Sequence, residues 1–183
     1  MRYIRKVAVA VSLIVLACSA SATAGQQCYS ALLDQEHAPT SVLKPVGETR
    51  LRVLLMRIYD AALFTRSGEF NGMEPMVLAI EYARDISAQQ LVNQTRDEWQ
   101  RMDLFDENSE QWLEQLAKMW PNVSSGDCLI AARTEDGTTQ FFSAEKSLGE
   151  IDAPEFAEKF FSIWLAENAR FRRSRDELVG ERG

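Results

Sequence analysis

The period of the apolar pattern changes between Tyr82 and Ser87, and this change limits the possible fold more than any single motif. Upstream, "RLRVLLMRIYDAALF" (residues 50–64) and "MVLAIEY" (residues 76–82) have the composition of strands, and the second also alternates. The first run is too long for one flat strand, so we expect a bend or bulge near Arg57–Tyr59. Downstream, apolar residues recur at helical spacing.

Three helices are predicted after this point. Ser87 and Gln90 form a capping box at the start of the first helix. The second helix ends at Pro121, because proline cannot continue a helix. Asp152 is expected to cap the third, "PEFAEKFFSIWLAE" (residues 154–167), which is apolar on more than one side and should be deeply buried.

Shorter strands complete the pattern. Residues 42–46 are expected to form an edge strand, since Pro45 cannot donate to a central ladder. Residues 128–133 and 139–143 flank the turn signal "EDG" and predict a hairpin, and residues 146–151 can add one more strand. Strands, two helices, more strands and a helix argue for the α+β class, with an antiparallel sheet and helices packed on one face.

The N-terminus has the features of a secretory signal peptide. Three basic residues precede an apolar segment at residues 7–17, and Ala22–Ala24 supply a small-x-small cleavage pattern. We expect cleavage after residue 24 and export to the periplasm, with lipoprotein processing at Cys18 as the alternative. No later apolar run is long enough to span a bilayer.

Residues 25–41 are expected to be a poorly structured lead-in to one domain at residues 42–180. Without the three basic residues of the leader, 17 of the 20 Lys and Arg remain against 27 Asp and Glu, a net charge of −10. A chain this acidic is a poor candidate for binding nucleic acid. Cys28 and Cys128 are the two cysteines left in an oxidising compartment, so we predict a disulfide between them; two free thiols are the alternative.

The usual signatures of cofactor and metal sites are missing. The chain has no phosphate-cradling glycine loop, zinc-ligand cluster or nucleophile elbow, so no cofactor and no metal are predicted. His37, the one histidine, is interpreted as a solvated linker residue, although a histidine-dependent catalytic site would need it. Arg84 and Asp85 are interpreted as an ion pair at a strand–helix corner, with a ligand role as the alternative.

Three arginines interrupt the apolar run at residues 50–64. If side chains alternate, Arg50 and Arg52 share one face of the strand, and Arg57 points the other way, toward solvent. A guanidinium turned inward needs an anionic partner, which can be a protein carboxylate or a ligand that carries an acid group. The alternative is that Arg50 and Arg52 lie on a wet face and form weak surface pairs.

Three segments in this order resemble the chalcone isomerase-like family. They are "VGETRLRVLLMRIYDAALF" (residues 46–64), "EYARDISAQQL" (residues 81–91) and "GEIDAPEFAEKFFSIWLAE" (residues 149–167). More narrowly, "WPNVSSGDCL" (residues 120–129) and "FFSIWL" (residues 160–165) are similar to a bacterial exported branch of that family.

The resemblance implies an open α+β sandwich in which a cleft between sheet and helices holds an apolar ligand. The family's arginine corresponds to Arg52 or Arg50, with Arg52 favoured, and Tyr59 and Ser162 match polar positions of the same cleft. Leu54 stands where the enzymes of the family carry a threonine. The helical segment that bears the enzymes' active-site Tyr and Asn has no counterpart between Ser87 and Pro121.

These implications favour a noncatalytic exported domain that binds a fatty acid or another apolar acid. One alternative is an intramolecular lyase of the chalcone isomerase type. Another is a structural or partner-binding protein whose cleft is filled by its own side chains; the sequence names no protein partner. Fold analogy alone does not choose among these functions.

Overall fold

The computed structural model describes residues 23–36 and 42–182. Residues 1–22 of the predicted leader, which include Cys18, and His37 lie outside these residues. In chain order the elements are α1 (Ala24–Leu33), β1 (Lys44–Val53), β2 (Met56–Thr65), β3 (Met76–Tyr82), α2 (Ala88–Arg101), α3 (Ser109–Met119), β4 (Cys128–Arg133), β5 (Thr139–Phe142), β6 (Ser147–Ile151), α4 (Pro154–Leu165) and α5 (Arg172–Leu178).

The six strands form one antiparallel sheet in the sequential order β1 to β6. The bulge expected near Arg57–Tyr59 is confirmed: Leu51 pairs with Tyr59 and Arg52 with Arg57, so that Ile58 is the extra residue of the bulge. The long apolar run as a whole is not one strand, however. It is a hairpin that reverses at Leu54 and Leu55, so that Val53 pairs with Met56. Leu54 takes a left-handed backbone conformation with φ 57°. The run contains no glycine, asparagine or proline, so it carries none of the usual signals of a turn.

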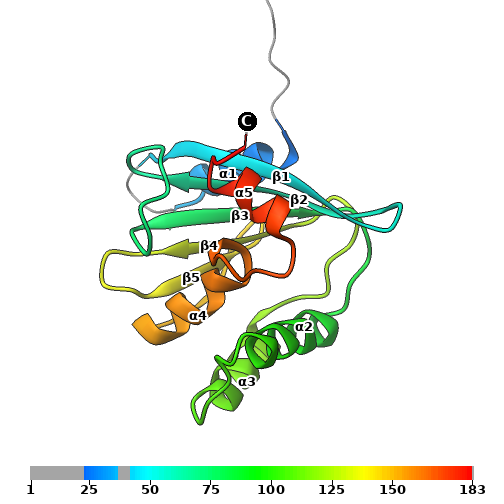
Figure 1. Ribbon diagram of the computed structural model, residues 1–183, viewed down its shortest axis with the longest axis vertical. Helices are drawn as coiled ribbons and strands as arrows, with labels where there is room; N and C mark the ends of the chain where they lie inside the picture. The colour runs from blue at the N-terminus through cyan, green and yellow to red at the C-terminus, as the bar shows by residue number, and fades with distance from the viewer. Residues whose placement is uncertain (1–22, 37–41, 183) are drawn as a thin grey trace, which may run out of the picture.

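Helices cover both faces of the sheet (Figure 1). Ala61 and Leu63 on β2 belong to the core cluster shared with α2 to α5, whereas Ala62 and Phe64 belong to a second cluster shared with α1. The expectation that helices pack on one face only, after a poorly structured lead-in, is therefore wrong for α1. The helix is short, and it docks by burying Tyr29 and other apolar side chains against the sheet.

The predicted disulfide is confirmed. Cys28 on α1 and Cys128 on β4 are bonded, with their Cα atoms 5.7 Å apart and 100 residues between them in sequence. The bond closes a long loop and fixes α1 to the centre of the sheet.

Local helix signals have mixed outcomes. The capping box of Ser87 and Gln90 is present at the start of α2. The predicted cap of α4 is wrong: Ala153 occupies the N-cap position without a side-chain hydrogen bond. Asp152 instead accepts a hydrogen bond from the Thr138 hydroxyl at 3.0 Å, which ties the end of β6 to the β4–β5 hairpin.

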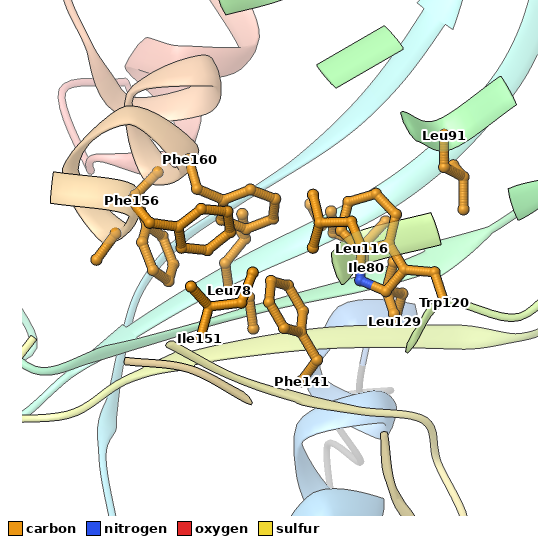
Figure 2. Packing of buried hydrophobic residues seen from close by; sticks show 14 of the residues in the cluster. Leu78, Ile80, Leu91, Leu116, Trp120, Leu129, Phe141, Ile151, Phe156 and Phe160 are labelled. Atoms are coloured by element: carbon orange, nitrogen blue, oxygen red, sulfur yellow. The ribbon is translucent and has the colours of Figure 1, made fainter. Parts of the chain in front are cut away.

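Aromatic rings of α4 pack on the sheet (Figure 2). Phe156 and Phe160 lie 5.5 Å apart by ring centroids, and Phe160 meets Phe141 of β5 edge to face at 5.2 Å. Trp120, which follows α3, packs against Phe141 at 5.5 Å. None of the helices in the described ranges is both long and apolar enough to cross a membrane.

Candidate functional site

A cavity of about 460 Å³ separates the sheet from helices α2, α4 and α5. Its wall is mostly apolar. The sheet contributes Leu51, Ile58, Leu78, Ile80, Leu129 and Phe141, and the helices contribute Leu91, Phe160, Ile163 and Trp164. The cleft is thus not filled by its own side chains, and its size falls in the range of small-molecule sites.

Of the four residues predicted to bind a ligand, Tyr59 lines this cavity. Its hydroxyl oxygen accepts a hydrogen bond from Trp164 Nε1 at 3.1 Å. Burial raises the pKa of Tyr59 far above its ordinary value, the Trp164 hydrogen bond opposes this shift, and the nearby Glu98 carboxylate adds to it. Tyr59 therefore stays protonated at neutral pH, and its O–H remains a hydrogen-bond donor in an apolar wall.

Trp120 adds a second donor. Trp120 is 6% exposed and lines the cavity, and its indole Nε1–H has no hydrogen-bond partner among residues 23–36 and 42–182. A buried donor left unpaired costs free energy, so such groups in native proteins call for a specific explanation. An acceptor atom on a bound molecule would satisfy it.

A buried carboxylate, Glu98, also lines the cavity, and sequence reasoning missed it. Glu98 accepts hydrogen bonds from Arg101 Nε at 2.8 Å, from Gln94 Nε2 at 2.9 Å and from Arg170 Nε. Arg101 and Gln94 are neighbours on α2, but Arg170 comes from the segment after α4. Two guanidinium groups therefore surround one buried carboxylate, and the cluster holds that segment against α2.

Three arginines line the cavity: Arg84, Arg170 and Arg175. Arg170 is held by Glu98, and Arg175 by Asp176 and Glu181. Arg84 is exposed at the rim, and no carboxylate of the described residues lies within ion-pair distance of it. This leaves Arg84 as the arginine of the wall that is available to an acidic ligand.

The predicted ion pair between Arg84 and Asp85 does not form. Arg84 Nη1 instead contacts Met56 Sδ at 3.5 Å, and Asp85 Oδ1 accepts from the Ser125 backbone N–H at 3.3 Å.

The other predicted ligand-binding residues lie outside the cavity. Arg50 donates to Asp60 of β2, and Ser162 Oγ donates to the Glu158 carbonyl of its own helix at 2.6 Å. Arg52 is exposed and forms no ion pair with any described residue; it borders a groove beside α5. The extra residue of the bulge is Ile58 on β2, so alternation holds along β1, where Arg50 and Arg52 are exposed on either side of buried Leu51.

Arg57 was expected to face solvent on the side of the strand opposite to Arg52. The structure differs on both points. The two arginines are direct cross-strand partners. Arg57 Nε donates to Asp60 at 2.9 Å, and Arg57 also pairs with Glu81 at 3.6 Å. In the part of the chain that the structure describes, no cluster of three His, Cys, Asp or Glu residues is placed to hold a metal ion.

The chain was compared with known protein families, sequences and solved structures. No family model matches the chain. A protein of Haemophilus influenzae, described as uncharacterized, is 25% identical over 146 residues, covering 79% of this chain and 71% of the relative. The crystal structure of a fatty-acid binding protein from Arabidopsis thaliana superimposes with a TM-score of 0.61 at 9% identity, covering 78% of this chain and 91% of the plant protein.

The fold is chalcone isomerase-like. This confirms the predicted fold class, an open α+β sandwich with an antiparallel sheet backed by helices. At 9% identity the plant structure shows the fold alone. Any ligand of the present chain must be argued from its own cavity.

Proposed function

We propose that this protein is a noncatalytic exported domain that binds a fatty acid or another apolar acid in the cavity between the sheet and helices α2, α4 and α5. The observation that carries the proposal is an apolar cavity of about 460 Å³ whose wall also contains Tyr59, a hydroxyl donor that burial keeps protonated. An apolar tail would fill the space, and an acceptor oxygen would pair with the donor. That a plant protein of this fold binds fatty acids supports the same ligand class.

The acid group is proposed to sit at the rim beside Arg84. Of the three arginines of the wall, Arg170 and Arg175 are held by carboxylates of the protein, whereas Arg84 at the mouth has no carboxylate partner among the described residues. Arginine can meet a carboxylate with two hydrogen bonds. The resemblance favours Arg52 as the arginine that binds the acid group, and this prediction is tested by the same titration with a fatty acid.

Export to the periplasm belongs to this proposal. A leader of signal-peptide type precedes the described residues, and the Cys28–Cys128 disulfide is typical of an oxidising compartment. Two segments, at residues 120–129 and 160–165, are also similar to a bacterial exported branch of the chalcone isomerase-like family.

The first test is mass spectrometry of small molecules extracted from protein that has been purified natively after export. Titration with a fluorescent fatty acid then measures affinity. Arg84→Ala should weaken binding about tenfold, as expected for a charged hydrogen-bonding pair. Arg66→Ala is the matched control, because Arg66 is exposed and pairs with Glu135 away from the cavity.

Arg52→Ala in the same titration separates the two candidate arginines. Because Arg52 does not line the cavity, its variant should bind like wild type. A larger loss for Arg52→Ala than for Arg84→Ala would restore the assignment from the resemblance. Absence of binding to wild type, together with no co-purified acid, would contradict the proposed function itself.

A further inference from the structure

The tip of the β1–β2 hairpin is apolar and exposed. Val53, Leu54, Leu55 and Met56 have 39%, 89%, 98% and 49% of their surface accessible. The hairpin extends beyond the neighbouring strands, so that its tip projects from the body of the protein (Figure 1). Single exposed apolar residues are ordinary, but four in succession at a projecting tip mark an interaction site.

The backbone of the tip strengthens this reading. Leu54 has φ 57°, a conformation that glycine and asparagine adopt at little cost and leucine does not. A leucine here is unfavourable both for the turn and for exposure to water. Strain kept at an exposed position points to function.

Charge around the tip suggests the chemistry of the partner. Asp60 and Glu81 are engaged by Arg50 and Arg57. Arg52 and Arg84 lie beside the tip, and neither has a carboxylate partner among the described residues. The carboxylate of the nearby Asp85 accepts a hydrogen bond from the Ser125 backbone N–H. The tip therefore presents leucines flanked by two available cations on a chain whose net charge is −7.

We propose that residues 53–56 insert into the surface of an anionic lipid membrane, with Arg52 and Arg84 contacting the lipid headgroups. A tip of four residues is too small for a stable protein interface, which buries about 800 Å² on each partner. Insertion into lipid needs no matching shape, only apolar side chains that enter the interface and basic residues at its edge.

The tip is continuous with the cavity. Val53 and Met56 lie both in the exposed tip and in the cavity wall, and Arg84 at the rim contacts Met56. Docking would place the mouth of the cavity against the lipid, so that an amphiphile could pass between them with little contact with water. The docking itself does not depend on the proposed ligand.

Co-sedimentation with protein-free vesicles tests the proposal. Exported protein is mixed with vesicles of equal parts phosphatidylcholine and phosphatidylglycerol, or of phosphatidylcholine alone. Wild type should bind the anionic vesicles, and Leu54→Ser with Leu55→Ser should lower the partition coefficient at least about tenfold. Arg52→Gln should lower it about fivefold on anionic vesicles only.

Val42→Ser is the matched control, because Val42 is 77% exposed just before the opposite end of β1. The wild type and all variants have the same N-terminus, so a difference between their partition coefficients reports the substituted residue alone. Thermal unfolding checks that each variant folds, and fatty-acid titration should give unchanged affinities, since Leu54, Leu55 and Arg52 do not line the cavity. Failure of wild type to bind vesicles, or equal binding by the double variant, would overturn the proposal in favour of a protein partner.

Discussion

Arg50 on β1 lies directly opposite Asp60 on β2 and donates to its carboxylate with Nε at 2.9 Å and Nη2 at 2.8 Å. Arg57 lies three residues before Asp60 on β2, and its Nε donates to the same carboxylate at 2.9 Å. The side chain of Asp60 is 8% exposed. Two of the three arginines in the apolar run therefore neutralise one buried acid of the sheet rather than a ligand.

Asp60→Asn should lower the free energy of unfolding by about 2 kcal/mol at neutral pH, because hydrogen bonds to a charged group are lost. Burial opposes ionisation of Asp60, but the hydrogen bonds from Arg50 and Arg57 prevail and hold its pKa below the ordinary value. The stabilisation is thus complete above about pH 3.9, the unfolded pKa, and is lost as the pH falls through the lower folded pKa. Urea unfolding of both proteins across this range should show the difference shrinking in acid; a constant difference would contradict it.

Loss of the disulfide should destabilise the protein and release α1. Cys28→Ser with Cys128→Ser removes a cross-link that spans 100 residues, and the chain-entropy model assigns about 4 kcal/mol to such a loop. Hydrogen exchange should show faster exchange in α1 than in α4. Non-reducing peptide mapping of the exported wild type should recover the linked pair, and free thiols there would defeat the prediction.

Leu54→Asn should stabilise the protein by about 1 kcal/mol, since asparagine tolerates the left-handed conformation that strains leucine. Thermal and urea unfolding measure this gain. Leu55→Asn is the control, because Leu55 is equally exposed but has no positive φ. If the two variants had the same stability, strain at Leu54 would not be the cause.

Trp120→Phe removes the unpaired N–H while keeping an aromatic ring in the cavity wall. Affinity for a fluorescent fatty acid should fall about fivefold, the value of one hydrogen bond. The fold should hold, because an unsatisfied buried donor is removed together with some apolar contact. Trp112→Phe is the control, since Trp112 is buried beside Trp99 and does not line the cavity. An unchanged affinity for Trp120→Phe would show that its N–H meets no ligand.

Chalcone should not be cyclised by this protein. Leu54, at the position of the enzymes' threonine, lies on the exposed hairpin tip and takes no part in the cavity wall. Chalcone absorbance followed with excess protein should match a buffer blank. Formation of a flavanone would establish the isomerase alternative.

Much of the fold could be predicted because its signals are local. The change of period near Tyr82 separates strands from helices, the Ser87 capping box starts α2, and "EDG" marks the β4–β5 hairpin. Each signal joins residues within a few positions of one another, where backbone geometry fixes the neighbours. The disulfide followed from counting cysteines.

The candidate site could be predicted only in part. Tyr59 was predicted from the resemblance to the chalcone isomerase-like family, and it lines the cavity. The functions of Arg50 and Arg57 were not predicted, because the turn at Leu54 and the bulge at Ile58 decide how β1 pairs with β2, and this pairing brings both arginines to Asp60. The turn at Leu54 and Leu55 contains no glycine or asparagine from which it could have been predicted.

The sequence by itself determined the order of strands and helices, the pairing of Cys28 with Cys128 and the class of fold. Only the tertiary structure decided that α1 docks on the second face, that Arg170 closes over Glu98 from 72 residues away, and that Arg84 is left at the rim. Short-range periodicity is encoded by neighbours along the chain. The partner of a buried charge is decided by distant segments that meet only when the core closes.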